Sequence, residues 1–433
     1  MRLAARACFT GILCLTASFA SAQYTAPGGP EPTPESREEA LQKSMEDARF
    51  RLGPVRIEPW LSVKDVAWIE TGTGTADADS DLTATAGAGV RGYLRTGPLI
   101  WSGQALPEYV WWREDADRRA LNGRYGLTTY GFWNRLTLEA GAGREEQQLI
   151  ITPELLQPSP VRQDQARAAV EVLWTDAFST LAEVQASEQS SQVEEEDTDG
   201  VPLPPPGAGA GLLNLRLLDR QETTARAGVR LRMRQTLMVG AGAERYEAEF
   251  ASPARAGGLD RSNSGVSPYL ELRLVRPGLS IAAEAVSRSL EAEKGASFAD
   301  YEKTTGSASV RFNTGGTVET AIYGGRTFVY SLLPEYSYLD DERLGASLRI
   351  DLGWRTHARF FAEGGRNTYT VLVPGALARE DDYTSYGGTF EIELGRAGSL
   401  ELRASRIRFD STVPAFDREL TSLGAALTFT GRD

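Results

Sequence analysis

The sequence predicts an all-β fold: a transmembrane, antiparallel, up-and-down β-barrel of about 18 strands, with 16 as the other possible count. Three observations predict it. Apolar and polar residues alternate with period two almost without interruption from residue 53 onward. The connections between the alternating segments are short and long by turns. No stretch after residue 22 is apolar enough for a transmembrane helix, so a membrane-spanning form must be a closed barrel.

The N-terminal segment has the features of a secretory signal, predicted to cover residues 1–22. Arg2 and Arg6 precede an apolar stretch too short to span a bilayer, and an Ala-Ser-Ala cleavage site follows it. Both cysteines, Cys8 and Cys14, lie in this segment, so the mature chain is predicted to hold no thiol and no disulfide. Removing the two arginines takes the formal charge from -13 to -15, which argues against a nucleic-acid partner.

Residues 23–52 are predicted to form a periplasmic N-terminal extension with a short helix. The helix is expected over residues 34–50, with Thr33 as its N-cap and acidic residues following. Two interpretations stay open: a mobile leader, or a helix that docks in the pore or on a partner. The helix carries a narrow apolar stripe of Ala40, Leu41, Met45 and Ala48.

Residues 53–433 are predicted to form the barrel. Its strands are expected to start near Arg56, Leu82, Leu99, Leu121, Arg135, Ala166, Phe178, Thr223, Leu237, Val266, Leu279, Thr304, Val318, Arg343, Ala358, Tyr383, Leu400 and Leu420. Short turns such as "TGP", "RPG" and "NTGG" are assigned to the periplasmic rim, and longer loops such as "TGTGTADADSD" and "SLLPEYSYLDDER" to the extracellular rim. Several strands exceed the length of a tilted span and are expected to project beyond the outer surface.

The apolar faces of the strands are predicted to meet lipid. A barrel of about 18 strands is too wide for side chains to fill, so the charged faces must line water inside. Aromatic residues agree with this orientation: Trp101, Trp174 and Phe178 lie beside short turns, and Tyr109 and Trp111 lie near the opposite end of their strand. These positions suit the two interfacial girdles of a membrane barrel.

The predicted lumen face carries charges of both signs. Such a set either forms a transverse field across a pore or makes a salt-bridged wall, and the sequence leaves both open. The pore-lining candidates are Arg226, Arg230, Arg232, Arg234, Glu271, Arg273, Arg349, Asp351, Glu391, Glu393, Glu401 and Arg403.

The last strand resembles the C-terminal assembly signal of bacterial outer-membrane proteins, in which a polar residue, a glycine, an apolar residue and a final aromatic residue follow at fixed positions. Here they are Ser422, Gly424, Leu427 and Phe429. The resemblance implies recognition by the barrel-assembly machinery. The opening strand, residues 51–72, also resembles the start of the β-barrel porins of type 2, which are often associated with exopolysaccharide export.

Catalytic chemistry is not indicated, and no cofactor is predicted. The single histidine, His357, has no serine partner in its surroundings along the chain. Gly87, Gly89 and Gly92 have the spacing of a dinucleotide fingerprint, but they lie within an alternating strand rather than at a strand-to-helix turn. We therefore predict that the protein is not an enzyme.

Four acidic clusters are predicted on the extracellular rim. They would bind divalent cations, raise the local cation concentration at a pore mouth, or remain solvated loops, and the sequence leaves these three possibilities open. The clusters are Asp77, Asp79 and Asp81; Glu194, Glu195, Glu196, Asp197 and Asp199; Asp340, Asp341 and Glu342; and Glu380, Asp381 and Asp382.

The predicted function is that of a porin-like channel of the cell outer membrane, for passive diffusion of small hydrophilic solutes. Apolar runs in the loop over residues 144–165 indicate that it packs into the mouth as a constriction. The alternative is a plugged structural or assembly barrel that serves surface polysaccharide export or envelope organisation. The expected partners are outer-membrane lipid, lipopolysaccharide and the barrel-assembly machinery, with a homo-oligomer as a further possibility.

Overall fold

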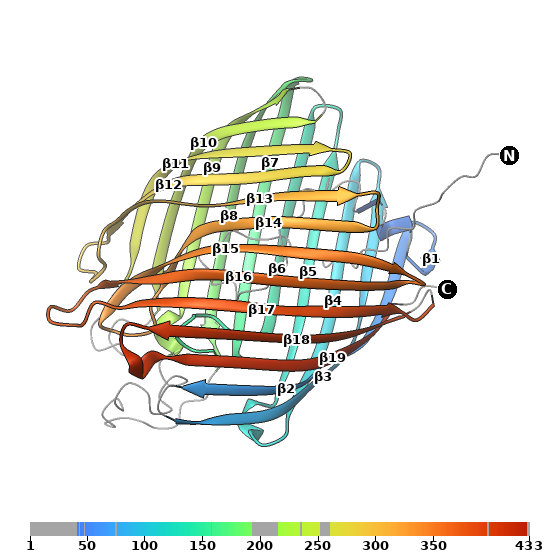
Figure 1. The fold of residues 1–433 in the computed structure, drawn as a ribbon. Helices are drawn as coiled ribbons and strands as arrows, with labels where there is room; N and C mark the ends of the chain where they lie inside the picture. The colour runs from blue at the N-terminus through green and yellow to red at the C-terminus, as the bar shows by residue number, and fades with distance from the viewer. Residues whose placement is uncertain are drawn as a thin grey trace.

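The protein is a β-barrel closed by its first and last long strands (Figure 1). The computed structural model describes residues 41–42, 44–46, 48–73, 76–156, 158–192, 215–233, 236–251, 260–395 and 398–430. Every strand pairs antiparallel with the next one along the chain, and β19 closes the ring on β2, with Leu423 opposite Trp68. The prediction of an all-β, antiparallel barrel of 18 strands is confirmed. Among the described residues, no helix is long and apolar enough to cross a membrane.

The barrel strands have the following bounds: β2 Val55–Thr73, β3 Ala76–Thr96, β4 Leu99–Trp112, β5 Ala120–Phe132, β6 Leu136–Leu149, β7 Ser159–Thr175, β8 Phe178–Ser191, β9 Arg220–Met233, β10 Leu237–Phe250, β11 Asn263–Arg276, β12 Leu279–Ala292, β13 Tyr301–Thr314, β14 Val318–Tyr330, β15 Tyr336–Gly353, β16 Thr356–Val371, β17 Glu380–Glu393, β18 Gly398–Ser411 and β19 Arg418–Thr430. Three short 3-10 helices lie between strands: η1 Ala116–Arg118, η2 Leu215–Leu218 and η3 Pro414–Phe416. A further short strand, β1 Phe50–Leu52, pairs with the start of β2.

Tight turns and longer connections lie on opposite rims, which we call the turn rim and the loop rim. The three short turns named above join β3 to β4, β11 to β12 and β13 to β14, as predicted. The prediction of the first long loop, over residues 71–81, is wrong. β2 continues to Thr73 and β3 begins at Ala76, so almost all of these residues belong to strands. Strand pairing satisfies backbone donors and acceptors that a loop would leave to water, and it carries this hairpin further outward.

The lipid-facing side of the wall is apolar, as predicted. Large hydrophobic side chains are exposed at alternate positions: on β2, for example, Leu61 is 50% exposed and Val63 41%. Trp174 and Tyr109, from the two predicted aromatic girdles, are 57% and 47% exposed. A soluble protein would bury such residues, whereas hydrocarbon stabilises them on the outside of a membrane barrel.

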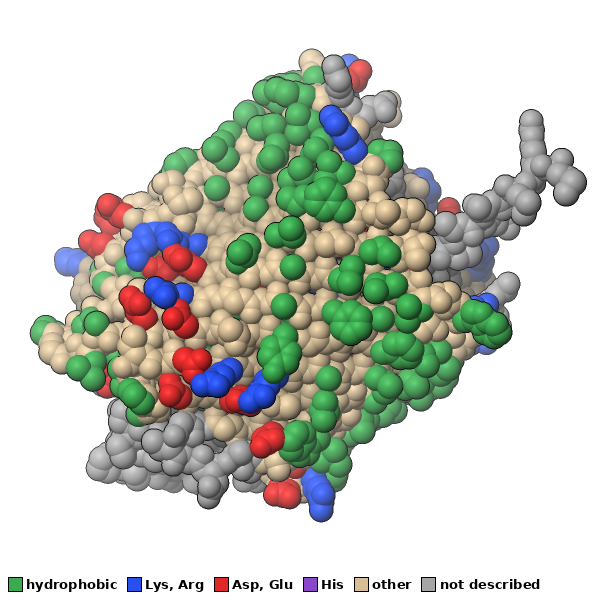
Figure 2. Space-filling view, in the orientation of Figure 1, with side chains coloured by type: hydrophobic (Ala, Val, Ile, Leu, Met, Phe, Trp, Pro, Cys, Tyr) green, Lys and Arg blue, Asp and Glu red, His purple; other side chains and the backbone are tan. Residues whose placement is uncertain are grey.

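Charged residues replace apolar ones on the outer wall toward the loop rim. In the face shown in Figure 2, hydrophobic side chains gather toward the turn rim and charged ones toward the loop rim. The charges form exposed ion pairs, such as Arg366 with Asp382 at 2.7 Å and Arg408 with Asp410 at 2.7 Å. Charges are costly in hydrocarbon, so this zone lies above the apolar band and agrees with strands that project outward.

Candidate functional site

The polar face of the strands is the concave, lumenal face. Side chains from strands that are not neighbours meet there, which is possible only on the inside of a curved wall. Arg226 of β9 contacts Glu284 of β12 at 2.9 Å, and Arg230 of β9 reaches Glu171 of β7 at 3.1 Å and Glu271 of β11 at 2.5 Å. The lumen is therefore lined by charged groups, while the apolar groups face outward.

The arginine row of β9 is neutralised by surrounding carboxylates. Arg226 also binds Glu244 of β10, a carboxylate that is only 1% exposed and receives Arg288 of β12 at 2.7 Å as well. Arg232 shares Glu171 with Arg230, at 3.4 Å. For these residues the salt-bridged wall, rather than the free transverse field, describes the structure. The remaining candidate of this row, Arg234, lies outside the described residues.

The predicted lumen residues of β15, β17 and β18 lie across the lumen from this row, close to the turn rim, whereas Arg273 lies on β11, two strands from β9. Glu391 of β17 and Glu401 of β18 stand directly opposite each other in the register. No lysine or arginine among the described residues forms an ion pair with either carboxylate. Arg403 of β18 pairs with Asp65 of β2. β9 and β18 lie half-way round the ring from one another.

His357 of β16 lies within this wall, between two carboxylates. Its Nδ1 is 2.6 Å from Asp351 Oδ1, and its Nε2 is 3.5 Å from Glu393 Oε1. Arg349 approaches the same Asp351 carboxylate at 3.6 Å. The sequence placed Arg349, Asp351 and Glu393 on the polar face but not His357, and it gave no sign that these residues meet.

Residues 150–156 and 158, which we call the strap, fold from the ends of β6 and β7 into the lumen. Its apolar side chains are buried: Ile151 is 6% exposed and Leu156 5%. Ile151 packs in a cluster that includes Leu290 of β12, whereas Leu156 packs against Tyr383 and Phe409 on the other side of the barrel. The predicted inward packing is confirmed for these apolar residues. The predicted loop bounds are wrong, because residues 144–149 belong to β6 and residues 159–165 to β7.

A second element, the infolded hairpin over residues 326–342, enters the lumen from the ends of β14 and β15. Pairing between β13 and β14 stops at Gly306 and Arg326, although both strands continue beyond this point. β14 then crosses toward strands that are not its neighbours: the Tyr330 hydroxyl accepts a hydrogen bond from Asn263 Nδ2 of β11 at 2.7 Å. Sequence analysis predicted an exposed loop over much of this hairpin, so that prediction is wrong.

Aromatic packing explains why the hairpin folds inward. Phe328, Tyr330 and Tyr338 continue the lipid-facing side of β14 and β15, yet they are 1% to 3% exposed. Phe328 meets Tyr301 of β13 edge to face, with ring centroids 4.9 Å apart. These rings extend above the apolar band, where the outer wall is otherwise charged, so burial in the lumen is their favourable environment. In the sequence, the signal for this inward fold was a run of aromatic residues at the loop-rim ends of β14 and β15, where the outer wall otherwise carries charged residues.

The strap and the hairpin meet through Glu154. Its carboxylate accepts hydrogen bonds from Ser331 Oγ at 2.6 Å and from the backbone N–H of Leu332. On the far side of the hairpin, Arg261 donates to the carbonyl oxygens of Ser331 and Leu333. Burial lowers the pKa of Arg261 to about 10, and the charge of Glu154 opposes this shift.

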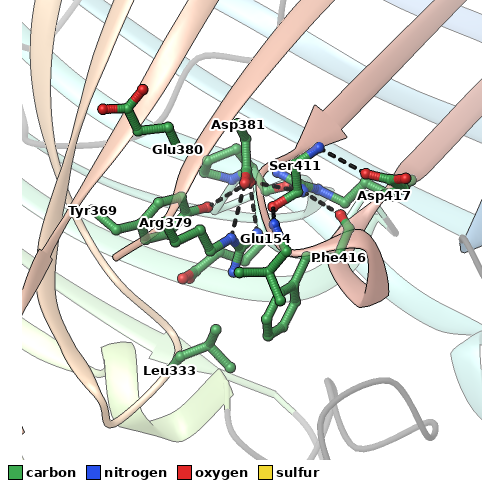
Figure 3. A network of polar contacts seen from close by, with 12 residues as sticks. Glu154, Leu333, Tyr369, Arg379, Glu380, Asp381, Ser411, Phe416 and Asp417 are labelled. Carbon is green, nitrogen blue, oxygen red and sulfur yellow. Dashed lines mark hydrogen bonds and ion pairs between the residues drawn. The ribbon is translucent and has the colours of Figure 1, made fainter. Parts of the chain in front are cut away.

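A buried ionic cluster holds the strap on the opposite wall (Figure 3). Arg418 of β19 donates through Nε to the Pro153 carbonyl oxygen at 2.5 Å and through Nη1 to Asp381 at 2.9 Å. Asp381 is fully buried and binds Arg379 at 2.6 Å. The Arg379 guanidinium stacks on Phe416, 3.9 Å from the ring centroid. Neither Arg379 nor Arg418 was a candidate residue, because their importance arises from contacts across distant parts of the chain.

The N-terminal extension also enters the barrel, at the turn rim. Leu41 and Ala48 are 1% and 3% exposed and pack against Tyr93 and Ile100, which lie on the lumenal face of β3 and β4. Arg51 donates to the Glu46 carbonyl oxygen at 3.0 Å. The described part of this segment is therefore docked on the lumen wall; the part of the predicted helix before Leu41 lies outside the described residues.

The structure describes the acidic clusters of the loop rim in part. No group of three or more potential metal ligands is found among the described residues. Asp340 and Asp341 lie within β15 and are 3% and 0% exposed, and Asp340 binds Tyr301 and Lys303 instead. The side chains of Asp77 and Asp79, and the whole cluster at residues 194–199, lie outside the described residues.

Comparison with known proteins gives similarity of structure only. A scan of protein-family models and a search of curated sequences find no match. Among solved structures, OccAB3 of Acinetobacter baumannii matches with a TM-score of 0.50 and 13% identity, over 86% of this chain and 99% of that one. OccK2 of Pseudomonas aeruginosa, solved with glucuronate, matches with 0.50 and 11%, over 87% and 98%. OpdK of P. aeruginosa, solved with vanillate, matches with 0.50 and 10%, over 86% and 98%.

These neighbours are outer-membrane porins, and this chain has their fold. The prediction of a porin-like barrel is confirmed at the level of the fold, and the predicted outer-membrane location is consistent with that fold. The finer resemblance of the opening strand to porins of type 2 stays a prediction, as does the role of Ser422, Gly424, Leu427 and Phe429 in assembly.

Proposed function

We propose that this protein is an outer-membrane channel through which small hydrophilic solutes diffuse passively. The observation that carries the proposal is the inverted polarity of the wall: ion pairs such as Arg226–Glu244 line the inside, and side chains such as Leu61 and Val63 face outward. A barrel of this width leaves room for water between its walls. Charged groups on such walls are stable because water and neighbouring charges solvate them.

Within this channel, the strap and the infolded hairpin form the constriction. Both lie toward the loop rim, and together they bring buried apolar groups such as Ile151 and Leu339 into the cross-section. Toward the turn rim, the wall instead carries the charged pairs of β7–β12 and the carboxylates of β17 and β18. We infer that the loop-rim half selects solutes by size and the turn-rim half by charge.

Two of the similar structures were solved with glucuronate and vanillate, which are small organic acids. This supports small hydrophilic organic molecules as the solute class for this chain. The arginines of the β9 wall offer donors to such solutes only in competition with the carboxylates that already bind them. We therefore propose passive diffusion of small hydrophilic solutes and assign no tight binding site.

Conductance of the purified, folded protein in a planar bilayer tests the proposal. We expect discrete, long-lived current steps, with a reversal potential in asymmetric salt that reports the charge preference. Folding is checked in the same preparation by heat-modifiable migration on gels. A correctly folded barrel that never conducts, in the wild type or in the variants below, would contradict the channel.

The alternative is a plugged structural or assembly barrel for surface polysaccharide export or envelope organisation. The observation that favours it is the extent of burial in the loop-rim half, where Thr152 of the strap and Leu339 of the hairpin are both 0% exposed. The same bilayer measurement separates the two functions, because a permanently plugged barrel stays silent.

A further inference from the structure

We infer that Glu154 and Arg418 latch the strap across the lumen and thereby set the size of the constriction. The inference rests on the proposed channel function, and it assigns positioning roles to two residues of the constriction. Three observations support it: a chain of contacts that spans the lumen, the contacts that hold Arg418 in place, and the charge balance that depends on Glu154.

Polar contacts form one continuous chain from wall to wall. Arg261, just before β11, holds the backbone of the hairpin at Ser331 and Leu333. The hairpin binds Glu154 of the strap through Ser331 Oγ and the Leu332 N–H, and the strap binds Arg418 of β19 through the Pro153 carbonyl oxygen. β11 and β19 lie on nearly opposite sides of the ring. The strap is therefore held at both of its sides by groups that belong to other parts of the barrel.

Arg418 is held in place by contacts with groups outside the strap. Its guanidinium binds Asp381 and the Phe416 carbonyl oxygen, at 2.9 and 2.8 Å, and lies 4.0 Å from the centroid of the Phe409 ring. Arg379 braces the same Asp381 carboxylate from the other side (Figure 3). A guanidinium with so little freedom loses little conformational entropy when its Nε donates to Pro153, so this contact is strong for a single hydrogen bond.

Glu154 balances the charge of buried cations on both sides of the lumen. The negative charge of Glu154 acts on Arg261 and on Arg379. Within the described residues, Arg261 is 3% exposed and forms no ion pair of its own. If the strap moved out, both the hydrogen bonds of Glu154 and this compensation would be lost. The latch therefore depends on Glu154, a single residue that can be substituted.

Single-channel recording of Glu154→Gln tests the latch, because this variant keeps the size of the side chain and removes its charge. We expect the variant to spend at least about tenfold more time in a state of higher conductance, the factor implied by losing one charge-assisted hydrogen bond. Arg418→Met should act in the same direction. The matched controls are Glu146→Gln, which lies on the outer wall of β6, and Arg408→Met, which is 59% exposed on the outer wall of β18; neither should change the current.

A reversible staple keeps the test independent of folding defects. The double variant Glu154→Cys with Ser331→Cys should hold the low-conductance state when oxidised and return to frequent opening after reduction. Conducting wild type with unchanged Glu154→Gln and no redox effect would overturn the latch and leave the channel intact. Silence of every folded variant would overturn the channel itself, whereas a silent wild type with a conducting Glu154→Gln would support the latch.

Discussion

At the scale of single residues, the most informative groups are buried charges outside the membrane band. Asp219 precedes β9 and accepts a hydrogen bond from the Ser191 backbone N–H at 2.6 Å. Burial raises the pKa of this carboxyl from 3.8 to about 6, against the opposing effect of its hydrogen bond and nearby arginines. The native protein therefore binds more protons at Asp219 than the unfolded chain does between these two pH values.

The sign of this linkage gives a prediction for Asp219→Asn. Stability of the wild type should fall as pH rises from about 4 to about 6, because ionisation of Asp219 is less favourable in the native state. The asparagine variant keeps the acceptor for Ser191 and lacks the charge, so it should resist urea more than the wild type at pH 7.5. Urea titrations in detergent at pH 4 and pH 7.5 measure the difference; an equal advantage of the variant at both pH values would contradict it.

At the scale of elements, a bend in the wall depends on the absence of side chains. Gly306 of β13 has φ +152°, and a Cβ built on it would lie 2.1 Å from the Glu284 carbonyl oxygen. A Cβ on its neighbour Gly325 of β14 would lie 2.4 Å from the Gly306 carbonyl oxygen. These glycines stand where β13–β14 pairing ends, so close backbone contact at this level permits β14 to turn into the lumen.

The N-terminal segment is the element for which the sequence left two states open. In the structure Leu41 is 1% exposed against the lumen wall, whereas Glu46 is exposed. We predict that Leu41→Cys reacts with a membrane-impermeant maleimide at least about tenfold more slowly than Glu46→Cys in the folded protein, because reaction requires local undocking. Both cysteines should react at similar rates after unfolding. Equal rates in the folded protein would favour the mobile leader.

At the scale of the whole molecule, charged groups that form no ion pair within the described chain lie on two separate parts of the lumen wall. Glu391 and Glu401 face the lumen on β17 and β18, and Arg273 faces it on β11. Within the described chain, none of these three forms an ion pair, in contrast to the neutralised arginine row. In the channel that we propose, mobile ions would supply the missing countercharge, so these groups would influence which ions enter.

We predict opposite shifts of the reversal potential from the two walls. Glu391→Gln combined with Glu401→Gln should lower the cation-to-anion permeability ratio, and Arg273→Gln should raise it. Bilayer recordings in asymmetric salt measure both. Glu419→Gln serves as the control, because Glu419 pairs with Arg406 on the outer wall. Identical reversal potentials in all variants would show that the constriction, rather than this wall, determines selectivity.

Local patterns along the chain predict the barrel. Strict alternation along strands such as β9, and tight turns at every second connection, are local properties, so the strand order and the two faces of each strand could be predicted residue by residue. The pore-lining role of the candidates on β9, β11, β15, β17 and β18 stays a prediction. The sequence also showed apolar runs in the predicted loop over residues 144–165, which indicated that this loop is buried. The apolar face of a strand must meet lipid and its polar face must meet the lumen, so the alternation of residues determines how each strand is oriented.

What fills the lumen depends on contacts between segments that are far apart in the sequence. Arg261, Glu154, Arg418 and Asp381 come from four separate connections and strands, and no periodicity relates them. Their contacts exist because the strap and the hairpin fold across the ring, and that folding depends on close backbone approach at glycines and on aromatic packing between distant strands. Local pattern fixes which way a strand faces, but only the closed ring decides which distant loops meet inside it.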